Sequence, residues 1–333
     1  MHERRPSARW VALAAGLALL LPGCPRTSSQ PERLTVGVVD IPAVGLVHLA
    51  RHSGFFREAG VDVRFVSFGT GREAVEALLD GRVEAATSLE TPLVARALAG
   101  DRPRVLTTLH QSSRNTRVVV PKDRNIRGPE DLRGRRVGVP RGTNAEYFLE
   151  TLVRLAGLEP LEVKHVDVRP QDAADALARR QVDAAAVWYP WAVCGHAPLE
   201  AVDCLELFSD GYTEVSLLLT RDDVLAARRE ALTRFLRALS RAEQLVLEHP
   251  DSALTALAAE LPQGGGPHLA EAWRRVTPQL GLDNLTLAVL DREADWMERR
   301  MDTPPPSVDF RALLFPDLML EIDSTAVTLL GDR

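Results

Sequence analysis

Short apolar runs alternate with longer amphipathic stretches through the first part of the chain. The runs have the length of buried strands, and the stretches between them place apolar residues at helical spacing. Strands are expected at 34–39, 61–68 and 83–88, with intervening helices that end near 59 and 79. Because strands joined through helices form parallel sheets with right-handed crossovers, this part is predicted to be a β-α-β-α-β unit.

The same order of runs and stretches recurs about a hundred residues later. Strands are expected at 136–139, 161–168 and 182–188, with helices at about 144–156 and 170–180. Corresponding strands are offset by about 101, 100 and 99 residues, a period too long for a solenoid repeat. The pattern predicts two lobes of one architecture.

Two further strand-like runs, at 117–122 and 214–220, lead out of the first and the second unit. Two such crossings would form a double hinge, after which the chain returns to the first lobe. Lobe 1 is therefore expected to comprise 34–118 and 217–333, and lobe 2 to comprise 119–216. The expected fold class is α/β, with a βαβαβ-based sheet and flanking helices in each lobe.

The chain after residue 222 is mostly amphipathic and is expected to be helical. Helices are predicted at 225–248, 251–261, 267–280 and 286–302. A tail after the prolines at 304–306 is expected to pack on lobe 1.

The N-terminal region has the pattern of an export signal. Arg4, Arg5 and Arg9 precede an apolar run at 10–21, which is too short for a comfortable membrane span. The following Leu-Pro-Gly-Cys sequence resembles a bacterial lipobox. We expect a signal peptide at 1–23, a lipid on Cys24 and a flexible tether at 24–33; simple cleavage of the signal is the alternative.

Charge and composition narrow the classes of partner. With 45% apolar and 26% charged residues the chain has an ordinary globular composition. Without residues 1–23 it has 37 basic and 45 acidic side chains, a net charge of −8. Nucleic acid is not expected as a partner, because phosphate binding needs a basic surface. No second apolar run approaches a membrane span, so the mature body is expected to be soluble and at most tethered.

Two cysteines remain beside Cys24. In an oxidising compartment Cys194 and Cys204 are predicted to form a disulfide, with two unpaired thiols as the alternative. No metal site is expected, because His196 is the only histidine near them and the spacing matches no zinc pattern.

The strand ends supply the candidate ligand contacts. Ligands of open α/β sheets bind beyond the carboxyl ends of strands, where 88–90 and 188–191 lie in the two halves. Helix N-termini at 40–45, 69–72 and 141–145 are candidate anion sites. The expected contacts are Asp40, Ile41, Pro42, Gly69, Thr70, Ser88, Leu89, Glu90, Gln111, Thr143, Asn144, Trp188, Tyr189, Trp191 and Glu214.

Several of these contacts have a purely structural alternative. Trp188 and Tyr189 would clamp an apolar or planar ligand, or pack between the lobes. Glu90 would receive a ligand amine, or cap the helix that follows it. The pattern Gly-Thr-x-x-Glu at 69–73 and 142–146 is explained by capping boxes, with or without ligand contact.

Few residues support the hypothesis that the protein is an enzyme. Gly69, Gly71 and Ala74 match the spacing of a dinucleotide fingerprint, but in the second β-α turn of the unit and in an exported chain. The chain has no G-x-S-x-G or H-E-x-x-H sequence, and its only lysines are Lys122 and Lys164. No enzyme activity or cofactor is therefore expected; an exported enzyme or nucleotide-binding protein that uses 69–71 is the alternative.

Four segments, in this order, resemble the nitrate/sulfonate/taurine-type substrate-binding proteins of ABC importers. They are 83–86, 132–139, 142–148 and 182–191, the last ending in Trp-Tyr-Pro-Trp. The likeness covers about residues 34–250. It implies a two-lobed periplasmic-binding fold of the second type that closes on a small solute.

The resemblance also implies a role and partners. The protein would be a lipid-anchored, monomeric receptor in the periplasm or on the outer face of a bacterial membrane, serving a permease and an ATPase. Its solute would be small and anionic or zwitterionic, such as a sulfonate, taurine or nitrate. Tyr189 stands where family members often have an acidic residue, so the resemblance does not extend to the solute itself. Some relatives bind pyrimidine precursors of thiamin and others are enzymes making them, but the export signal argues against an enzyme.

Overall fold

The computed structural model describes residues 2, 32–192, 194–195, 197–262, 268–303 and 305–330. The expected signal peptide, the lipid site at Cys24 and most of the expected tether lie outside the described residues. Residues 32 and 33, also expected in the tether, already belong to the first strand and pair with 61 and 62.

The first sheet has seven strands in the order β12-β11-β4-β10-β3-β1-β2. The strands are β1 (Glu32–Val39), β2 (Val61–Phe68), β3 (Ala85–Leu89), β4 (Arg104–Ser112), β10 (Glu214–Thr220), β11 (Thr277–Asp283) and β12 (Val327–Thr328). β1 pairs in parallel with β2 and β3, as the crossover pattern predicted. β10 lies antiparallel between β3 and β4.

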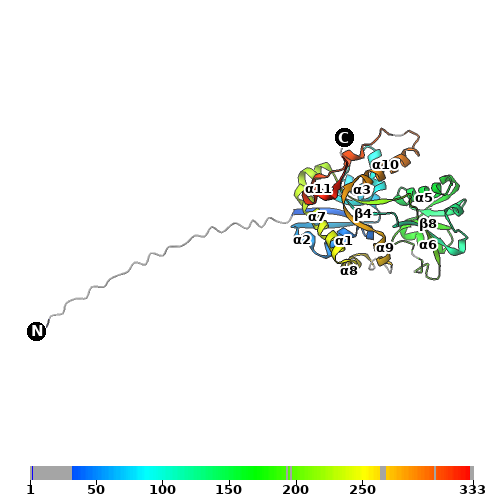
Figure 1. Cartoon of the computed structure of the whole chain (residues 1–333), viewed down its shortest axis with the longest axis horizontal. Coiled ribbons are helices and arrows are strands. Elements are labelled where there is room, and N and C mark those ends of the chain that lie inside the picture. The colour runs from blue at the N-terminus through cyan, green and yellow to red at the C-terminus, as the bar shows by residue number, and fades with distance from the viewer. Residues whose placement is uncertain are drawn as a thin grey trace. The chain divides into compact units, whose positions relative to one another are not determined.

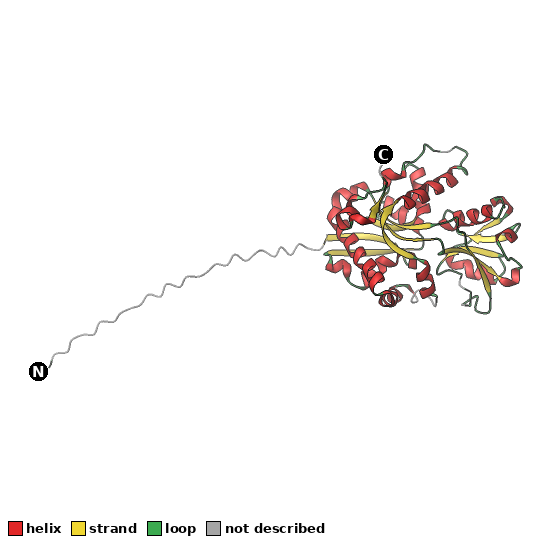
Figure 2. Cartoon of the chain, in the orientation of Figure 1, coloured by secondary structure: helices red, strands yellow, loops and turns green. Residues whose placement is uncertain are grey.

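The second sheet has five strands in the order β7-β6-β8-β5-β9. The strands are β5 (Thr116–Pro121), β6 (Arg136–Val139), β7 (Lys164–Asp167), β8 (Ala184–Trp188) and β9 (Cys204–Leu207). β6 pairs in parallel with β7 and β8, which repeats the arrangement of β1, β2 and β3. Figure 2 shows the two sheets as separate layers with helices around each, and we call each sheet with its helices a lobe.

Helices cover both sheets. In the first lobe they are α1 (Gly45–His52), α2 (Phe55–Glu58), α3 (Gly71–Leu79), α4 (Glu90–Leu98), α7 (Asp222–Glu248), α8 (Pro250–Glu260), α9 (Leu269–Arg275), α10 (Asn284–Glu298) and α11 (Asp317–Ile322). In the second lobe they are α5 (Asn144–Leu155) and α6 (Ala173–Ala178). Figure 1 shows α5, α6 and β8 together at one end of the folded body.

The two crossings between the lobes lie at 113–115 and 208–213. β5 pairs with β8 and β9, so residues 116–118 belong to the second sheet and not to lobe 1 as expected. β10 pairs with β3 and β4, so residues 214–216 belong to the first sheet and not to lobe 2. Both strands are fully buried, and a uniformly buried run does not reveal which sheet it joins.

Two expected helices differ from the structure. The helix expected at 267–280 is wrong, because α9 ends at Arg275 and β11 follows and pairs with β4. Pro278 lacks the N–H that would continue a helix. The first expected helix is divided into α1 and α2 at Gly54, which has φ of 72°.

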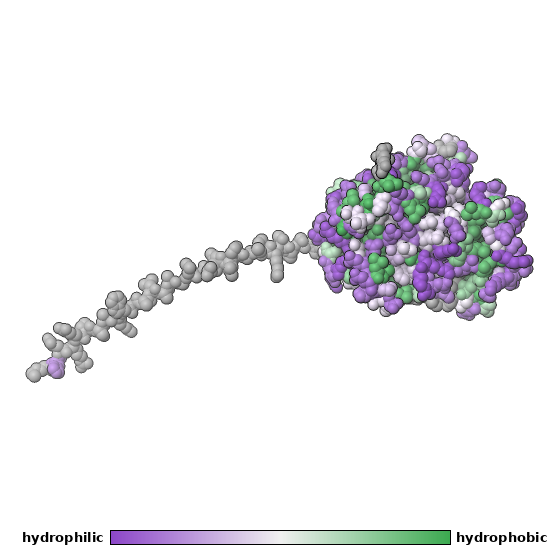
Figure 3. Space-filling model, in the orientation of Figure 1, coloured by the Kyte–Doolittle hydropathy of each residue, from purple (hydrophilic) through white to green (hydrophobic). Residues whose placement is uncertain are grey.

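The C-terminal part of the chain packs on the first lobe. β12 pairs with β11, and Leu314 forms a parallel bridge to Val105 of β4. Among the described residues, no helix combines the length and apolarity needed to cross a membrane. On the face shown in Figure 3 most of the surface is hydrophilic, with separate smaller apolar areas.

Candidate functional site

A pocket lies where the carboxyl ends of strands from both lobes meet. Seven expected contacts line it: Ile41, Thr70, Ser88, Leu89, Thr143, Asn144 and Trp188. Six further residues complete the lining: Val39, Val44, Gly71, Arg72, Pro92 and Ser216. Val44, Gly71 and Arg72 belong to the helix N-termini expected as anion sites, whereas Val39, Pro92 and Ser216 were not expected. The volume of the pocket is about 30 Å³, room for about two water molecules, so a larger solute requires a wider pocket.

Eight expected contacts lie outside this lining: Asp40, Pro42, Gly69, Glu90, Gln111, Tyr189, Trp191 and Glu214. Asp40 and Pro42 are the neighbours of Ile41 in the turn after β1. Gln111 donates a hydrogen bond from Nε2 to Asp283 Oδ2 over 2.9 Å. The carboxyl groups and the two aromatic side chains belong to the networks described below.

Two helix N-termini, one from each lobe, border the pocket. α3 begins after Thr70, whose Oγ1 accepts a hydrogen bond from Glu73 N, while Glu73 Oε2 accepts one from Gly69 N over 2.9 Å. The threonine half of the expected capping box is thus formed, but the Glu73 carboxylate binds the N–H of Gly69 and not that of the N-cap Thr70. Because the backbone N–H groups of the first turn carry the positive end of the helix dipole, both α3 and α5 favour an anion at this position.

The second expected capping box is not formed. Glu146 Oε2 accepts a hydrogen bond over 2.9 Å from Gly142 N, one residue before the N-cap Thr143. Thr143 does not cap the helix; its Oγ1 donates to Pro140 O over 2.7 Å. The threonine that precedes α5 is thus held by the β6–α5 loop.

Close packing explains why glycines occupy positions 69 and 71 of the turn before α3. A Cβ on Gly71 would lie 2.7 Å from Ser88 Oγ and 3.2 Å from Ser88 Cα. A Cβ on Gly69 would lie 3.2 Å from Glu73 Oε2. The spacing that resembles a dinucleotide fingerprint is therefore explained by close packing of α3 on β3 and by the hydrogen bonds of Glu73 to the 69–70 turn.

Arg72 places a guanidinium group at the pocket. It is the second residue of α3, and its side chain is 57% exposed. Its nearest acid in an ion pair is Glu76, with 4.0 Å between Nε and Oε1. Gly142 of the second lobe lies opposite, because a Cβ there would be 3.8 Å from Arg72 Nη1. The guanidinium thus adds positive charge where the two lobes approach.

A buried polar network lies behind the pocket at the crossings. Glu214, the first residue of β10, accepts hydrogen bonds from Asn115 Nδ2 over 2.6 Å and from the Thr116 hydroxyl. Its Oε1 also lies 3.1 Å from His110 Nε2. Asn144 Nδ2 of the second lobe donates to Glu214 Oε2 over 3.3 Å. Glu214 therefore connects the lobes and is not available to a solute.

Glu90 belongs to the same network. Its Oε1 accepts from Tyr212 Oη over 3.1 Å and its Oε2 from Val215 N over 2.9 Å. Burial, and then the charge of Glu214, raises the pKa of Glu90 to about 8. The structure does not bring Glu90 to the pocket surface, so it does not support the expected contact with a ligand amine.

The Tyr189 ring contacts two arginines, one from each lobe. The Arg117 guanidinium carbon is 3.7 Å from the ring centroid, and that of Arg275, from α9 of the first lobe, is 5.0 Å away. Tyr189 Oη donates to Glu206 Oε1 over 3.1 Å. Trp191 is half-buried beside them, and its carbonyl oxygen accepts from Arg117 Nη2. These contacts match the packing interpretation of Tyr189.

The structure joins Cys194 and Cys204 in a disulfide, with Cα atoms 6.0 Å apart. The bond links the segment after β8 to the first residue of β9, within the second lobe.

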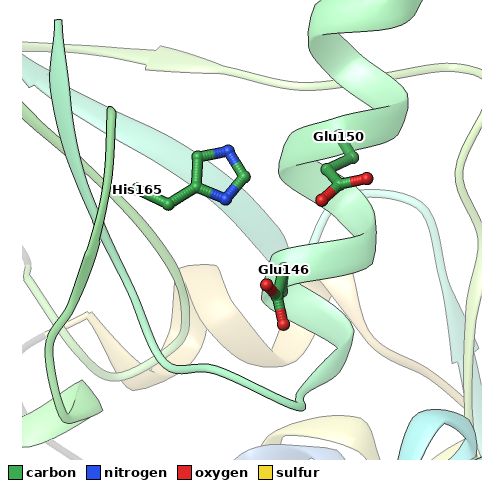
Figure 4. A group of neighbouring side chains, drawn as sticks. All are labelled: Glu146, Glu150 and His165. Carbon is green, nitrogen blue, oxygen red and sulfur yellow. The ribbon is translucent and has the colours of Figure 1, made fainter. Parts of the chain in front are cut away.

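Glu146, Glu150 and His165 form a group with metal-ligand spacing (Figure 4). Arginines and a tryptophan already bind the carboxylate oxygens. Glu146 Oε1 accepts from Arg141 over 2.7 Å and from Arg300, and Glu150 Oε2 accepts from Trp296 Nε1. The arrangement is an ion-pair cluster, which does not fit a cation.

Comparisons with known proteins agree with this architecture. A family model described as "NMT1/THI5 like" matches residues 42–253. The taurine-binding periplasmic protein of Escherichia coli K12 is 26% identical over 280 residues, which cover 77% of this chain and 83% of that protein.

Two solved structures illustrate the fold. The alkanesulfonate-binding protein SsuA from Xanthomonas axonopodis pv. citri, bound to MOPS, is 20% identical with a TM-score of 0.72; the match covers 87% of this chain and 100% of that chain. The desulfurization enzyme DSZB is 18% identical with a TM-score of 0.61, covering 88% of this chain and 99% of that chain. The predicted two-lobed α/β fold is confirmed.

Proposed function

The chain belongs to the NMT1/THI5-like family, and from this premise we propose that it is the solute-binding protein of an ABC importer. Its solute is a small organic anion, such as a sulfonate, held between the lobes. The observation that carries the proposal is the convergence of the α3 and α5 N-termini, with Arg72, on one pocket between the lobes. The taurine-binding relative supports the same solute class.

The mechanism follows from the division of the site between lobes. α3 and Arg72 belong to the first lobe and α5 to the second, so an anion satisfies positive ends on both sides only when the lobes close. The apolar body of the solute packs against Val39, Leu89 and the Trp188 ring. Closure then presents the two lobes to the permease in one relative orientation.

Export and anchoring complete the proposal. The signal at 1–23 directs the chain across the membrane, and a lipid on Cys24 holds it at the outer face. There it serves a permease and an ATPase as a monomer, without catalysis. A binder of a thiamin-pyrimidine precursor and an exported enzyme or nucleotide-binding protein are the competing functions.

A thermal-shift screen of purified residues 24–333 tests the proposal, with titration calorimetry of each hit. Alkanesulfonates, taurine, nitrate, a hydroxymethylpyrimidine and NAD are compared at equal concentration. A ligand that binds only the folded state raises Tm, so we expect stabilisation by sulfonates, with no change in the ligand on incubation. Selective stabilisation by NAD or the pyrimidine, or turnover of a sulfonate, would overturn the proposal.

A further inference from the structure

Two residues that line the interlobe pocket each carry a polar side-chain atom without a hydrogen-bond partner among the described residues. These atoms are Ser216 Oγ and Trp188 Nε1, and both are buried. Both residues line the pocket, and 0% of Ser216 and 4% of Trp188 are exposed. Native proteins rarely leave buried polar groups unpaired, because the lost hydration is not replaced. A group held for a ligand is a recognised exception.

The two atoms come from opposite lobes. Ser216 is on β10, opposite Leu89 of β3 on one side and His110 of β4 on the other. A register irregularity follows immediately between 216 and 217, and such irregularities re-aim side chains. Trp188 is the last residue of β8 in the second lobe. A solute that binds both atoms therefore spans the cleft.

The chemistry of the two groups defines the head of the solute. An indole N–H only donates, and a serine hydroxyl donates one hydrogen bond. Together with the positive ends of α3 and α5, they suit an anionic head with two or more oxygen acceptors. Glu90, the carboxyl group expected to receive an amine, has both oxygens bonded to Tyr212 and Val215.

We infer that Trp188 Nε1 and Ser216 Oγ donate hydrogen bonds directly to the acidic head of the solute, one from each lobe. The same geometry favours an organic monoanion with an apolar body, such as an alkylsulfonate, over a zwitterionic aminosulfonate. This inference rests on the proposed function and deepens it, because it assigns the solute class and two specificity-determining residues.

Titration calorimetry with pentanesulfonate, pentanoate and taurine tests the inference on four variants. Trp188→Phe keeps an aromatic ring and removes the N–H, and Ser216→Ala removes only the hydroxyl. Trp273→Phe and Ser209→Ala make the same changes at buried positions outside the pocket lining. Circular dichroism and the Tm without ligand report whether each variant folds.

We expect the wild-type protein to bind pentanesulfonate at least about 10-fold more tightly than taurine. Each pocket variant should lose about 10-fold or more in affinity for pentanesulfonate, as for a hydrogen bond to a charged group, while each control changes affinity less than about 2-fold. Ser216→Ala should keep or raise the ligand-free Tm, because it removes a buried unpaired group. If Ser216 had only a structural role, Ser216→Ala would lower the ligand-free Tm. Stronger binding of pentanoate would support the same donors with a carboxylate head.

Two results would overturn the inference while the proposed function stands. One is binding of a sulfonate that is unchanged in both pocket variants. The other is tighter binding of taurine than of pentanesulfonate to the wild-type protein. If the wild-type protein bound none of the anions, the proposed function itself would fail, so the two failures are distinguishable.

Discussion

Trp296 Nε1 donates a hydrogen bond to Glu150 Oε2 across 2.8 Å, and this bond joins α10 of the first lobe to α5 of the second. Arg300, just beyond α10, adds ion pairs to Glu150 and, over 3.2 Å, to Glu146. On another face of the second lobe, Arg275 Nη1 pairs with Glu206 Oε2 over 2.9 Å. Together with the hydrogen bond from Asn144 to Glu214, these polar contacts hold the two lobes together.

Removing the α10 contact should shift the protein toward an open form. In Arg300→Ala, Glu146 retains its ion pair with Arg141, whereas Glu150 retains only the hydrogen bond from Trp296. We expect a larger radius of gyration in small-angle X-ray scattering without ligand. Solute affinity should fall about 3- to 10-fold, because a smaller fraction of molecules is closed. Arg237→Ala, which removes an exposed arginine from α7, is the control; equal effects of the two changes would contradict the assignment.

Stability should fall as pH rises because of the buried carboxyl group of Glu90. Its pKa is raised to about 8 from an ordinary value of 4.5 in the unfolded chain, so the folded protein keeps a proton that the unfolded chain releases. The stabilisation is complete below pH 4.5 and is lost as pH rises through 8. Burial also raises the pKa of Glu293, which acts in the same direction.

Glu90→Gln tests this pH dependence, since an amide keeps the size and polarity of the protonated group. From pH 5 to 9 the wild-type protein should lose about 4 kcal/mol more stability than the variant, about 8 to 16 °C in Tm. Thermal unfolding followed by circular dichroism measures both profiles. Parallel profiles would show that Glu90 ionises in the folded protein without penalty.

Tyr189 should matter more for stability than for solute binding. Its ring packs between Arg117 and Arg275 and is 2% exposed, so Tyr189→Ala should destabilise by about 3 kcal/mol. Tyr189→Phe loses one hydrogen bond to Glu206 and should cost about 1 kcal/mol. Both variants should bind the solute within about 3-fold of the wild-type protein. A 10-fold loss in Tyr189→Phe would place the hydroxyl at the solute instead.

Arg72→Ala should weaken anion binding without loss of stability, because the side chain is 57% exposed and its pair with Glu76 is long. We expect about 10-fold lower affinity and a smaller dependence of affinity on salt, measured by calorimetry between 20 and about 300 mM NaCl. Arg64→Ala on β2, also exposed, is the matched control. Unchanged affinity in Arg72→Ala would show that the helix N-termini bind the anion without a contribution from Arg72.

The internal repeat made the architecture predictable, because each unit carries its own strand and helix signals. The parts that failed depend on tertiary pairing. β4 was not predicted and β11 was expected to be helical, since neither is recognisable without the strand it pairs with. For the same reason β5 and β10 were placed in the wrong lobes at their first residues.

The site residues that could be predicted from the sequence are those at the carboxyl ends of strands. Leu89 and Trp188 were identified because they end β3 and β8. Ser216 was not, because its place depends on the insertion of β10 between β3 and β4. Glu90 and Tyr189 lie next to pocket residues in sequence, but adjacent side chains at a strand end point in different directions.

The position of β10 also limits how the family's chains can vary in length. Along this strand Glu214 and Ser216 alternate with Val215 and Leu217, which pack into the first lobe's apolar core. A single residue inserted near the start of β10 would exchange these two sets and put Val215 where Ser216 stands. The crossing at 208–213 lies outside both sheets and accommodates such an insertion at lower energy. Insertions and deletions during divergence should therefore collect in that crossing, and the strand after it should keep its length.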